Sequence, residues 1–364
     1  MNPRFHLLFA FLGLVAGVAP AQETNRSPIA IWETEALVSG SMGYRSNVLR
    51  SSIAAESSAF FTTSFDASVL RFSESGSLVL LYLFGEDTRY LDAPSVNYEQ
   101  FISGTLQLVQ PVGDGKEAGL EANYLYQHQI FDASADEVNR ERVLVLGHGA
   151  YLRPYWKQAM GQWEAQAEAG LARQEFERTL DDYWETEAEL RLTRNYGHRS
   201  EVSVGYLPLY RRYDTRQQFD ADGFVLPGTE LNYLQHDVEG EWRHYWDAAR
   251  SWRSLTKMSF MANRDNGSGY FDYDRVYLRE QLRWKNDRWE VKGSARAGWY
   301  DYRKQRIDGA HRYRSYATVD FRVERRFRED WLVFGAGEHE WNVSNNPLDE
   351  YRSWMVELGL GYEF

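Results

Sequence analysis

The chain has no cysteine among its 364 residues, which excludes disulfides, thiolate catalysis and cysteine-ligated metal sites. It is also short of positive charge, because 41 Lys and Arg stand against 53 Asp and Glu, a net charge of −12. An acidic balance argues against a nucleic-acid binder, which normally presents a basic face. After Val18, no uncharged apolar stretch approaches 18 residues. If the rest of the chain enters a membrane, it does not enter as a helix.

The N-terminus has the pattern of an export signal. Arg4 supplies a positive charge, Leu7 to Val18 is an uncharged apolar run, and Ala19-Pro20-Ala21 places small residues before a cleavage point. The run is too short to span a bilayer comfortably. We therefore expect residues 1–21 to be a cleaved signal peptide and residues 22–364 to form the mature domain.

Aromatic residues are abundant, at 15% of the chain with 13 Trp and 24 Tyr, and they fall into alternating segments. Between Trp289 and Trp299, apolar and small residues occupy every second position and polar residues fill most of the positions between. Alternation over about ten residues is typical of a strand in a membrane β-barrel, with aromatic girdles at both lipid interfaces. The spacing of these two tryptophans fits the two girdles.

We count sixteen such segments, or 343/16 ≈ 21 residues per strand and connection. This predicts an all-β fold, a single transmembrane antiparallel β-barrel of about sixteen strands with short periplasmic turns and longer extracellular loops. The short connections are expected at Glu74–Ser77, Gln110–Lys116, Asn195–Ser200, Lys285–Arg288 and Arg325–Asp330. The long connections are expected at Gly85–Glu99, Phe131–Glu141, Arg211–Thr229 and Asp301–Arg312.

Two other folds compete with this prediction. Residues 155–194 are rich in Ala, Glu, Gln and Leu, which favour a helix by propensity alone. The same segment also fits a period of two, and context favours strands over intrinsic propensity. A soluble stack of β-sandwiches would alternate as well.

The last strand carries the most specific pattern. Six apolar or aromatic residues alternate with other residues up to the terminal Phe: Trp354, Val356, Leu358, Leu360, Tyr362 and Phe364. The segment resembles the terminal strand of Gram-negative outer-membrane β-barrel proteins. The resemblance implies a location in the cell outer membrane, a strand read by the barrel assembly machinery, and closure against the first strand.

A second resemblance lies near the first strand. Gly43-Tyr44-Arg45-Ser46-Asn47-Val48 resembles the Gly-Tyr-x-x-Asn-Val/Ile opening of uncharacterised putative β-barrel porins. It implies a fold and a location more than an activity. The expected partners are outer-membrane lipid and lipopolysaccharide, the barrel assembly machinery and small hydrophilic solutes, with no nucleic acid. A homo-trimer is compatible with the sequence.

Charge is distributed unevenly along the predicted strands. Gln162–Leu190 holds nine acids against two arginines, a net of −7, whereas Arg275–Arg328 holds sixteen basic residues against seven acids, a net of +9. A sixteen-stranded barrel leaves a water-filled lumen, so inward charges would set pore selectivity. We expect opposed acidic and basic walls in a pore for passive diffusion of small hydrophilic solutes. The residues expected to line the pore are Glu164, Glu168, Glu185, Glu187, Glu189, Arg275, Arg279, Arg283, Lys292, Arg296, Arg314 and Arg322.

Alternative interpretations of the same residues stay open. The charged ladders could pair through salt bridges and simply keep the interior polar. In the alternation that places the listed residues inward, Glu280 points toward lipid, which suggests a bulge or shifted register in its strand. An export barrel for exopolysaccharide is the alternative function, and an outer-membrane lipid-modifying hydrolase is a further one. His148 has no serine or acid at triad-like spacing, whereas His311 sits beside Asp308 in a long loop, which is a more suggestive but weak signal of an enzyme. We therefore assign no catalytic residues, no metal ligands and no cofactor.

Overall fold

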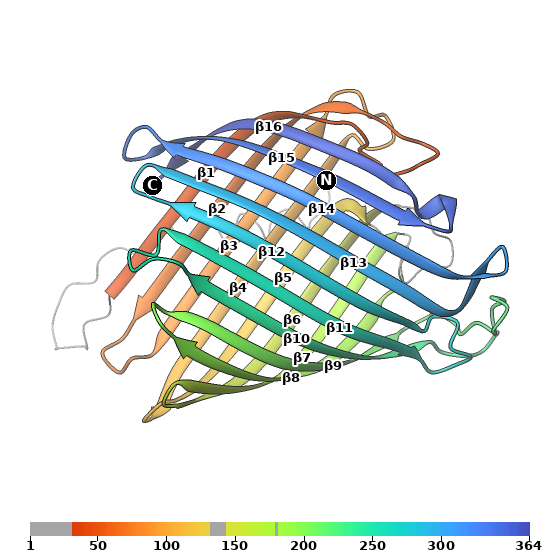
Figure 1. Cartoon of the computed structure of the whole chain (residues 1–364), viewed down its shortest axis with the longest axis horizontal. Helices are drawn as coiled ribbons and strands as arrows, with labels where there is room; N and C mark the ends of the chain where they lie inside the picture. The colour runs from red at the N-terminus through yellow and green to blue at the C-terminus, as the bar shows by residue number, and fades with distance from the viewer. Residues whose placement is uncertain (1–30, 132–142, 179–180) are drawn as a thin grey trace, which may run out of the picture.

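The computed structural model describes residues 31–131, 143–178 and 181–364, which form one closed antiparallel β-barrel of sixteen strands (Figure 1). Each strand pairs with its neighbours in the chain, and β16 pairs with β1 to close the ring. The strands are β1 (Ile31–Arg45), β2 (Ser58–Phe72), β3 (Leu78–Tyr90), β4 (Tyr98–Gly113), β5 (Lys116–Phe131), β6 (Val143–Met160), β7 (Trp163–Arg178), β8 (Tyr183–Tyr196), β9 (Ser200–Tyr213), β10 (Asn232–Tyr245), β11 (Trp252–Asp265), β12 (Tyr273–Lys285), β13 (Trp289–Ile307), β14 (Ala310–Arg326), β15 (Trp331–Ser344) and β16 (Tyr351–Glu363).

The predicted fold class is therefore confirmed, including the strand count. The segment whose composition favours a helix forms the end of β6 and the strands β7 and β8. Its alternation outweighs its propensity because a strand with one apolar face can bury that face only in the right register. In the described part of the chain, no helix combines the length and apolar character needed to cross a membrane.

The C-terminal strand closes the barrel as expected. Its pairing with β1 runs from Leu37 opposite Glu363 to Arg45 opposite Met355 without a break. The backbone N–H of Phe364 donates to the carbonyl of Ala36 at 2.8 Å. Full closure leaves no open sheet edge, which is the condition for strands to exist in hydrocarbon.

The two ends of the barrel differ. At the end that holds the C-terminus, on the left in Figure 1, short turns join the strands, and we call it the short-turn end. The opposite end, called the long-loop end, carries longer connections such as 46–57 and 214–231. The predicted connection Phe131–Glu141 lies almost wholly outside the described residues, as does the predicted signal peptide 1–21.

The long loop expected at Asp301–Arg312 is wrong. Here β13 and β14 continue beyond their neighbours and meet in a two-residue turn at Asp308 and Gly309. Both residues have positive φ, 49° and 82°, as a type I′ hairpin turn requires, and Asp-Gly is a favoured pair for that turn. A register shift between Asp301 and Arg306 marks where this hairpin leaves the regular barrel.

Buried apolar side chains gather at the long-loop end rather than along the barrel axis. One cluster includes Val48, Tyr90 and Val96, under the connections 46–57 and 91–97. A second joins Leu231, Tyr233 and Phe271, so that connection 214–231 packs on connection 266–272. These clusters give the loops a fixed position over the ends of the strands.

Candidate functional site: the charged inner face

The strand register separates an outer from an inner face along the charged strands. Directly opposed residues of an antiparallel pair lie on the same face, and residues alternate between faces. On β12 and β13, Leu278, Leu282 and Trp299 lie on the outer face, where they are exposed, and the residue directly opposite each of them lies on that same face. Every residue expected to line a pore occupies the alternate, inner positions of β7, β8, β12, β13 and β14: Glu164, Glu168, Glu185, Glu187, Glu189, Arg275, Arg279, Arg283, Lys292, Arg296, Arg314 and Arg322.

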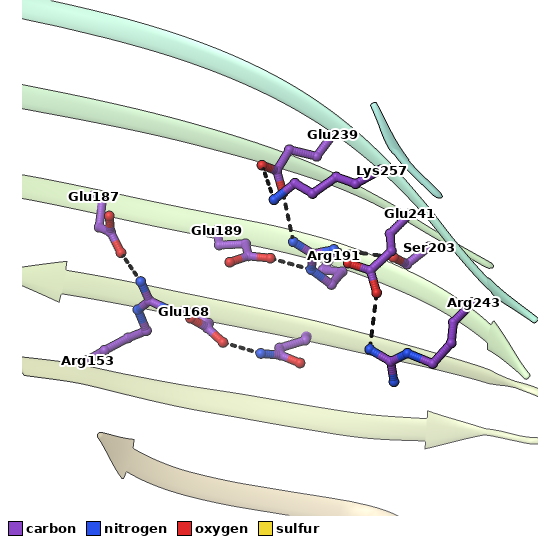
Figure 2. A network of polar contacts seen from close by, with 11 residues as sticks. Arg153, Glu168, Glu187, Glu189, Arg191, Ser203, Glu239, Glu241, Arg243 and Lys257 are labelled. Atoms are coloured by element: carbon purple, nitrogen blue, oxygen red, sulfur yellow. Dashed lines mark hydrogen bonds and ion pairs between the residues drawn. The ribbon is translucent and has the colours of Figure 1, made fainter. Parts of the chain in front are cut away.

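The acidic strands are not a bare acidic surface. Arg153 of β6 lies between two of the predicted carboxylates, with Nη1 3.1 Å from Glu168 and Nη2 2.6 Å from Glu187 (Figure 2). Arg211 of β9 donates to Glu185 at 2.7 Å. The negative charge of β7 and β8 is therefore largely matched by arginines from adjoining strands.

A second arginine extends this network around the barrel. Arg191 of β8 donates to Glu189 and, at 3.2 Å, to Glu239 of β10, while Lys257 of β11 reaches the same Glu239 at 2.7 Å (Figure 2). Among the described residues, Glu164 is the predicted carboxylate without a cation in ion-pair range. Sequence reasoning missed Arg191 because the acidic segment was taken to end at Leu190, one residue earlier, and it missed Arg153, Arg211 and Lys257 because they come from other strands.

The basic strands have a different arrangement, in which cations oppose cations. Nearest the short-turn end, the first cationic row consists of Arg253, Arg283, Lys292 and Arg322, each directly opposite the next across β11, β12, β13 and β14. The middle cationic row consists of Lys257, Arg279 and Arg296 in the same manner. Like charges directly opposite each other destabilise a sheet, so strand stability does not account for these rows.

A third cationic row lies toward the long-loop end. It consists of Arg275 and Arg314, with Tyr300 between them in register. Along β12 the three rows are spaced by four residues, about 13 Å apart at the usual strand rise. Together the rows run along the inner face of four adjacent strands.

Carboxylates neutralise these rows in part: Arg275 pairs with Asp237 at 3.3 Å, Arg322 with Glu324 at 2.5 Å and Lys257 with Glu239 at 2.7 Å. Glu290 is shared by Arg283 at 2.9 Å, Lys292 at 2.8 Å and Lys285 at 3.7 Å. Arg296 reaches Asp320 and Glu338 only at 3.8 and 3.7 Å. Arg279 has no ion pair within the described ranges, and its Nε is buried without a hydrogen-bond partner. In the middle row, Arg279 is therefore the cation whose charge stays unpaired among the described residues.

Tyrosines surround the third row. Tyr273, Tyr300 and Tyr302 form a buried cluster beside it, and Arg314 lies over the ring of Tyr300 at 5.6 Å. Behind them, Arg312 and Asp349 form a salt bridge of 2.7 Å in which neither side chain is exposed. Rings and buried pairs of this kind hold the cations of the third row in fixed positions.

The suggested bulge in the strand of Glu280 is wrong. β12 pairs with β11 and β13 without a register shift. Glu280 does face outward, between Leu278 and Leu282, and accepts a hydrogen bond of 2.5 Å from Thr256 Oγ1. The register tolerates this carboxylate because a neighbouring hydroxyl satisfies one of its oxygens.

The strand histidines lie on the outer face and associate with aromatic rings. His148 Nδ1 lies 2.6 Å from the hydroxyl of Tyr124, and His236 Nδ1 lies 2.6 Å from that of Tyr206. His148 also lies 3.9 Å from Glu177, and no serine among the described residues forms a hydrogen bond with it. In the part of the chain that is described, no group of three or more His, Asp or Glu could hold a metal ion. These contacts are those of interfacial residues.

The residues expected to guide assembly share the outward phase of the last strand: Trp354, Val356, Leu358, Leu360, Tyr362 and Phe364. Val356, Leu358, Leu360 and Tyr362 oppose outward-facing residues of β1 in register, and Trp354 and Phe364 lie just beyond the ends of that paired segment. Leu358, for example, opposes Met42, and both are well exposed. β16 thus presents an apolar surface outward while its backbone completes the ring.

Comparisons with known proteins give the context of this barrel. No family model and no curated protein matches the chain. Among solved structures it is similar to OccAB3 of Acinetobacter baumannii, at 7% identity and a TM-score of 0.48, over 92% of this chain and 99% of the other. It is similar to an anion-selective porin from Comamonas acidovorans, at 10% identity and a TM-score of 0.48, over 92% and 100%. OccAB1 of A. baumannii matches at 8% identity and 0.47, over 92% and 97%.

Proposed function

We propose that this protein is an outer-membrane pore for the passive diffusion of small hydrophilic solutes, and that its inner charges favour anions. The observation that carries the proposal is the stack of cationic rows on β11–β14, in which like charges oppose one another. Such an arrangement costs stability where carboxylates of the protein, mobile anions or water do not relieve it. Rings of inward charge set selectivity in membrane pores.

The opposed-wall hypothesis takes a modified form. Carboxylates on β7 and β8 have arginine partners, so the field across the lumen would come mainly from the cationic rows. Glu164 and the unpaired part of the acidic strands would contribute a weaker opposing charge. The pairing supports a zwitterionic surface on one side and a cationic surface on the other.

The alternatives fit this inner face less well. An export barrel is expected to be charged uniformly around its tunnel, whereas the rows of opposed cations here are confined to β11–β14. A lipid-modifying hydrolase would need a nucleophile beside a histidine near the rim. The outer-face histidines with recorded hydrogen bonds instead contact tyrosine hydroxyls.

The proposal extends to export and assembly. Residues 1–21 would be removed on export, β16 would be read by the barrel assembly machinery, and the short-turn end would face the periplasm. Outer-membrane lipid and lipopolysaccharide would contact the exposed apolar face, and three barrels could associate as a homo-trimer.

The test is selectivity in planar bilayers. Protein would be taken from the outer-membrane fraction of a Gram-negative host, where the proposal expects a first residue of Gln22. A reversal potential in a salt gradient would then be measured for the wild type and for R279Q/R283Q/R296Q. A unit charge about 6 Å from a passing ion contributes roughly 0.7 kcal/mol in water, about threefold in permeability. We expect the triple variant to reduce anion preference at least threefold.

The control is R194Q. Arg194 faces outward over the ring of Trp163, so its loss leaves the inner charge intact and the reversal potential unchanged. Folded barrels without conductance would overturn the pore, and an unchanged reversal potential in the triple variant would overturn the role of the rows.

A further inference from the structure

One part of the inner face is apolar. The apolar strip, as we call it, consists of Leu70 and Phe72 of β2, Leu78, Leu80 and Phe84 of β3, and Phe101 of β4. Leu70 opposes Leu80 and Phe72 opposes Leu78 in register, and the rings of Phe84 and Phe101 lie 6.1 Å apart. These residues alternate with the outward-facing Phe61 and Phe65, which are exposed. The strip therefore runs along the barrel from the short-turn end toward its middle.

The sequence of β3 accounts for the strip. Leu78-Val79-Leu80-Leu81-Tyr82-Leu83-Phe84 is apolar or aromatic at every position, so both faces of the strand are apolar. Strands of this composition normally have both faces covered. The inner face of a wide membrane barrel is usually polar. Phe72 remains 37% exposed, and the other five side chains are half-buried.

The surroundings of the strip indicate what would cover it. β3 and β11 are eight positions apart in the ring of sixteen, so the strip lies across the barrel from the cationic rows. Asp66 and Glu86 share the inner face of β2 and β3, and Tyr82 donates to Asp66 at 2.7 Å. These carboxylates repel an anionic group from the strip, while the opposite side attracts it.

We propose that the lumen binds amphipathic organic anions of the alkyl carboxylate class, with the apolar chain on the strip and the carboxylate directed toward the cationic rows. The proposal rests on the pore proposed above. The field of the rows draws the anion into the lumen, and removal of apolar surface from water holds its chain on Leu70, Leu80 and Phe84. Leucines form half of the strip, which favours an aliphatic chain over a sugar, although Tyr82 lies between Leu80 and Phe84 and Gln107 opposes Leu80 on the same face.

Octanoate and acetate are the matched probes. Both carry one carboxylate, and they differ by six methylene groups that only the strip would recognise. With the mature protein in planar bilayers under chloride, we expect octanoate to halve the current at a concentration at least tenfold lower than acetate. A tenfold ratio requires only a small part of the transfer free energy of six methylenes.

The variant L80S/F84S tests the strip itself, and it is expected to bring the half-blocking concentrations of the two probes to within about twofold. Leu255 is an inner-face leucine of β11, opposite Gln281, and L255S is the matched control that should keep the tenfold ratio. F84L, which keeps an apolar side chain, should keep it also. Heat-modifiable migration on gels confirms that each variant is folded.

The outcomes separate the two proposals. Conductance with equal block by octanoate and acetate, or an equal loss of the ratio in L255S, would overturn the apolar binding site alone. Folded barrels that conduct no ion would overturn the pore, and the binding site with it.

Discussion

The buried salt bridge between Arg312 and Asp349 allows a quantitative test of what stabilises the long-loop end. Asp349, at the end of the short 3-10 helix η3 (Pro347–Asp349), accepts from Arg312 Nε at 3.1 Å and Nη2 at 2.7 Å. Arg312 also donates to Gln305 at 2.9 Å and lies over the ring of Tyr302 at 4.2 Å. Neither charged side chain is exposed. The guanidinium would thus be left buried without its counterion in D349N.

Removing one partner of a buried pair costs about 3–5 kcal/mol, because the remaining charge is uncompensated. We expect D349N to lower the free energy of unfolding by that amount. Replacing both partners by apolar residues of similar volume, R312M/D349L, is expected to cost less than either single change. Together with the wild type and the single variants R312M and D349L, this double variant forms a double-mutant cycle whose coupling energy isolates the pair.

The assay is urea unfolding in lipid vesicles followed by tryptophan fluorescence, with hydrogen exchange of 301–312 as a local readout. A loss below about 1 kcal/mol in D349N, together with unchanged exchange in the hairpin, would refute the reasoning. So would a double variant that loses as much as the two single variants combined, since the pair would then carry no coupling. R325Q, on the outer face over Trp289, is the control for loss of an arginine alone.

Two further predictions concern single carboxylates. E290Q removes the acid shared by Arg283, Lys292 and Lys285, so anion preference should rise roughly threefold in a reversal-potential measurement, and a fall would contradict the first cationic row. Asp272 lies in connection 266–272, where burial, with the nearby Asp265 carboxylate, raises its pKa above the ordinary value. A raised carboxyl pKa means that the folded loop loses stability as pH rises from the ordinary value through the raised one. The protection factors of residues 266–272, in which the intrinsic pH dependence of exchange is divided out, should therefore rise as pH falls through this range, and in D272N this dependence should disappear; equal pH dependence of protection in both proteins would exclude Asp272 as its source.

The sequence predicts the strands well because lipid on one side and water on the other impose a period of two on each of them. That constraint identifies even β7 and β8, whose composition favours a helix. The period of two did not locate the Asp308-Gly309 hairpin, because the polar composition of residues 301–312 was interpreted as a loop. The Asp-Gly pair itself was the local signal for a tight turn.

Only part of the candidate site could be predicted from the sequence. Alternation gives the face on which Arg279 or Glu187 lies, but the ion partner of Glu187 is set by cross-strand register and comes from Arg153, two strands away in the chain. The direct opposition of Arg279 and Arg296 depends on register in the same way. The apolar strip had a visible signal in the unbroken apolar run Leu78–Phe84, because a strand with two apolar faces departs from the barrel pattern.

The outer tryptophans of β13 have a consequence for the lipid around the barrel. Trp289 and Trp299 are both exposed on one strand, ten residues apart, so at the usual rise and a tilt near 40° they are separated by about 26 Å along the bilayer normal. Since neighbouring strands are hydrogen-bonded all around the ring, this separation is rigid. A single helix adapts to a change in bilayer thickness by changing its tilt, whereas a closed barrel of this width has little scope to do so. In membranes with a thicker hydrocarbon layer, the lipid must thin at the barrel wall, and neighbouring barrels that share the thinned zone would attract one another without any direct contact.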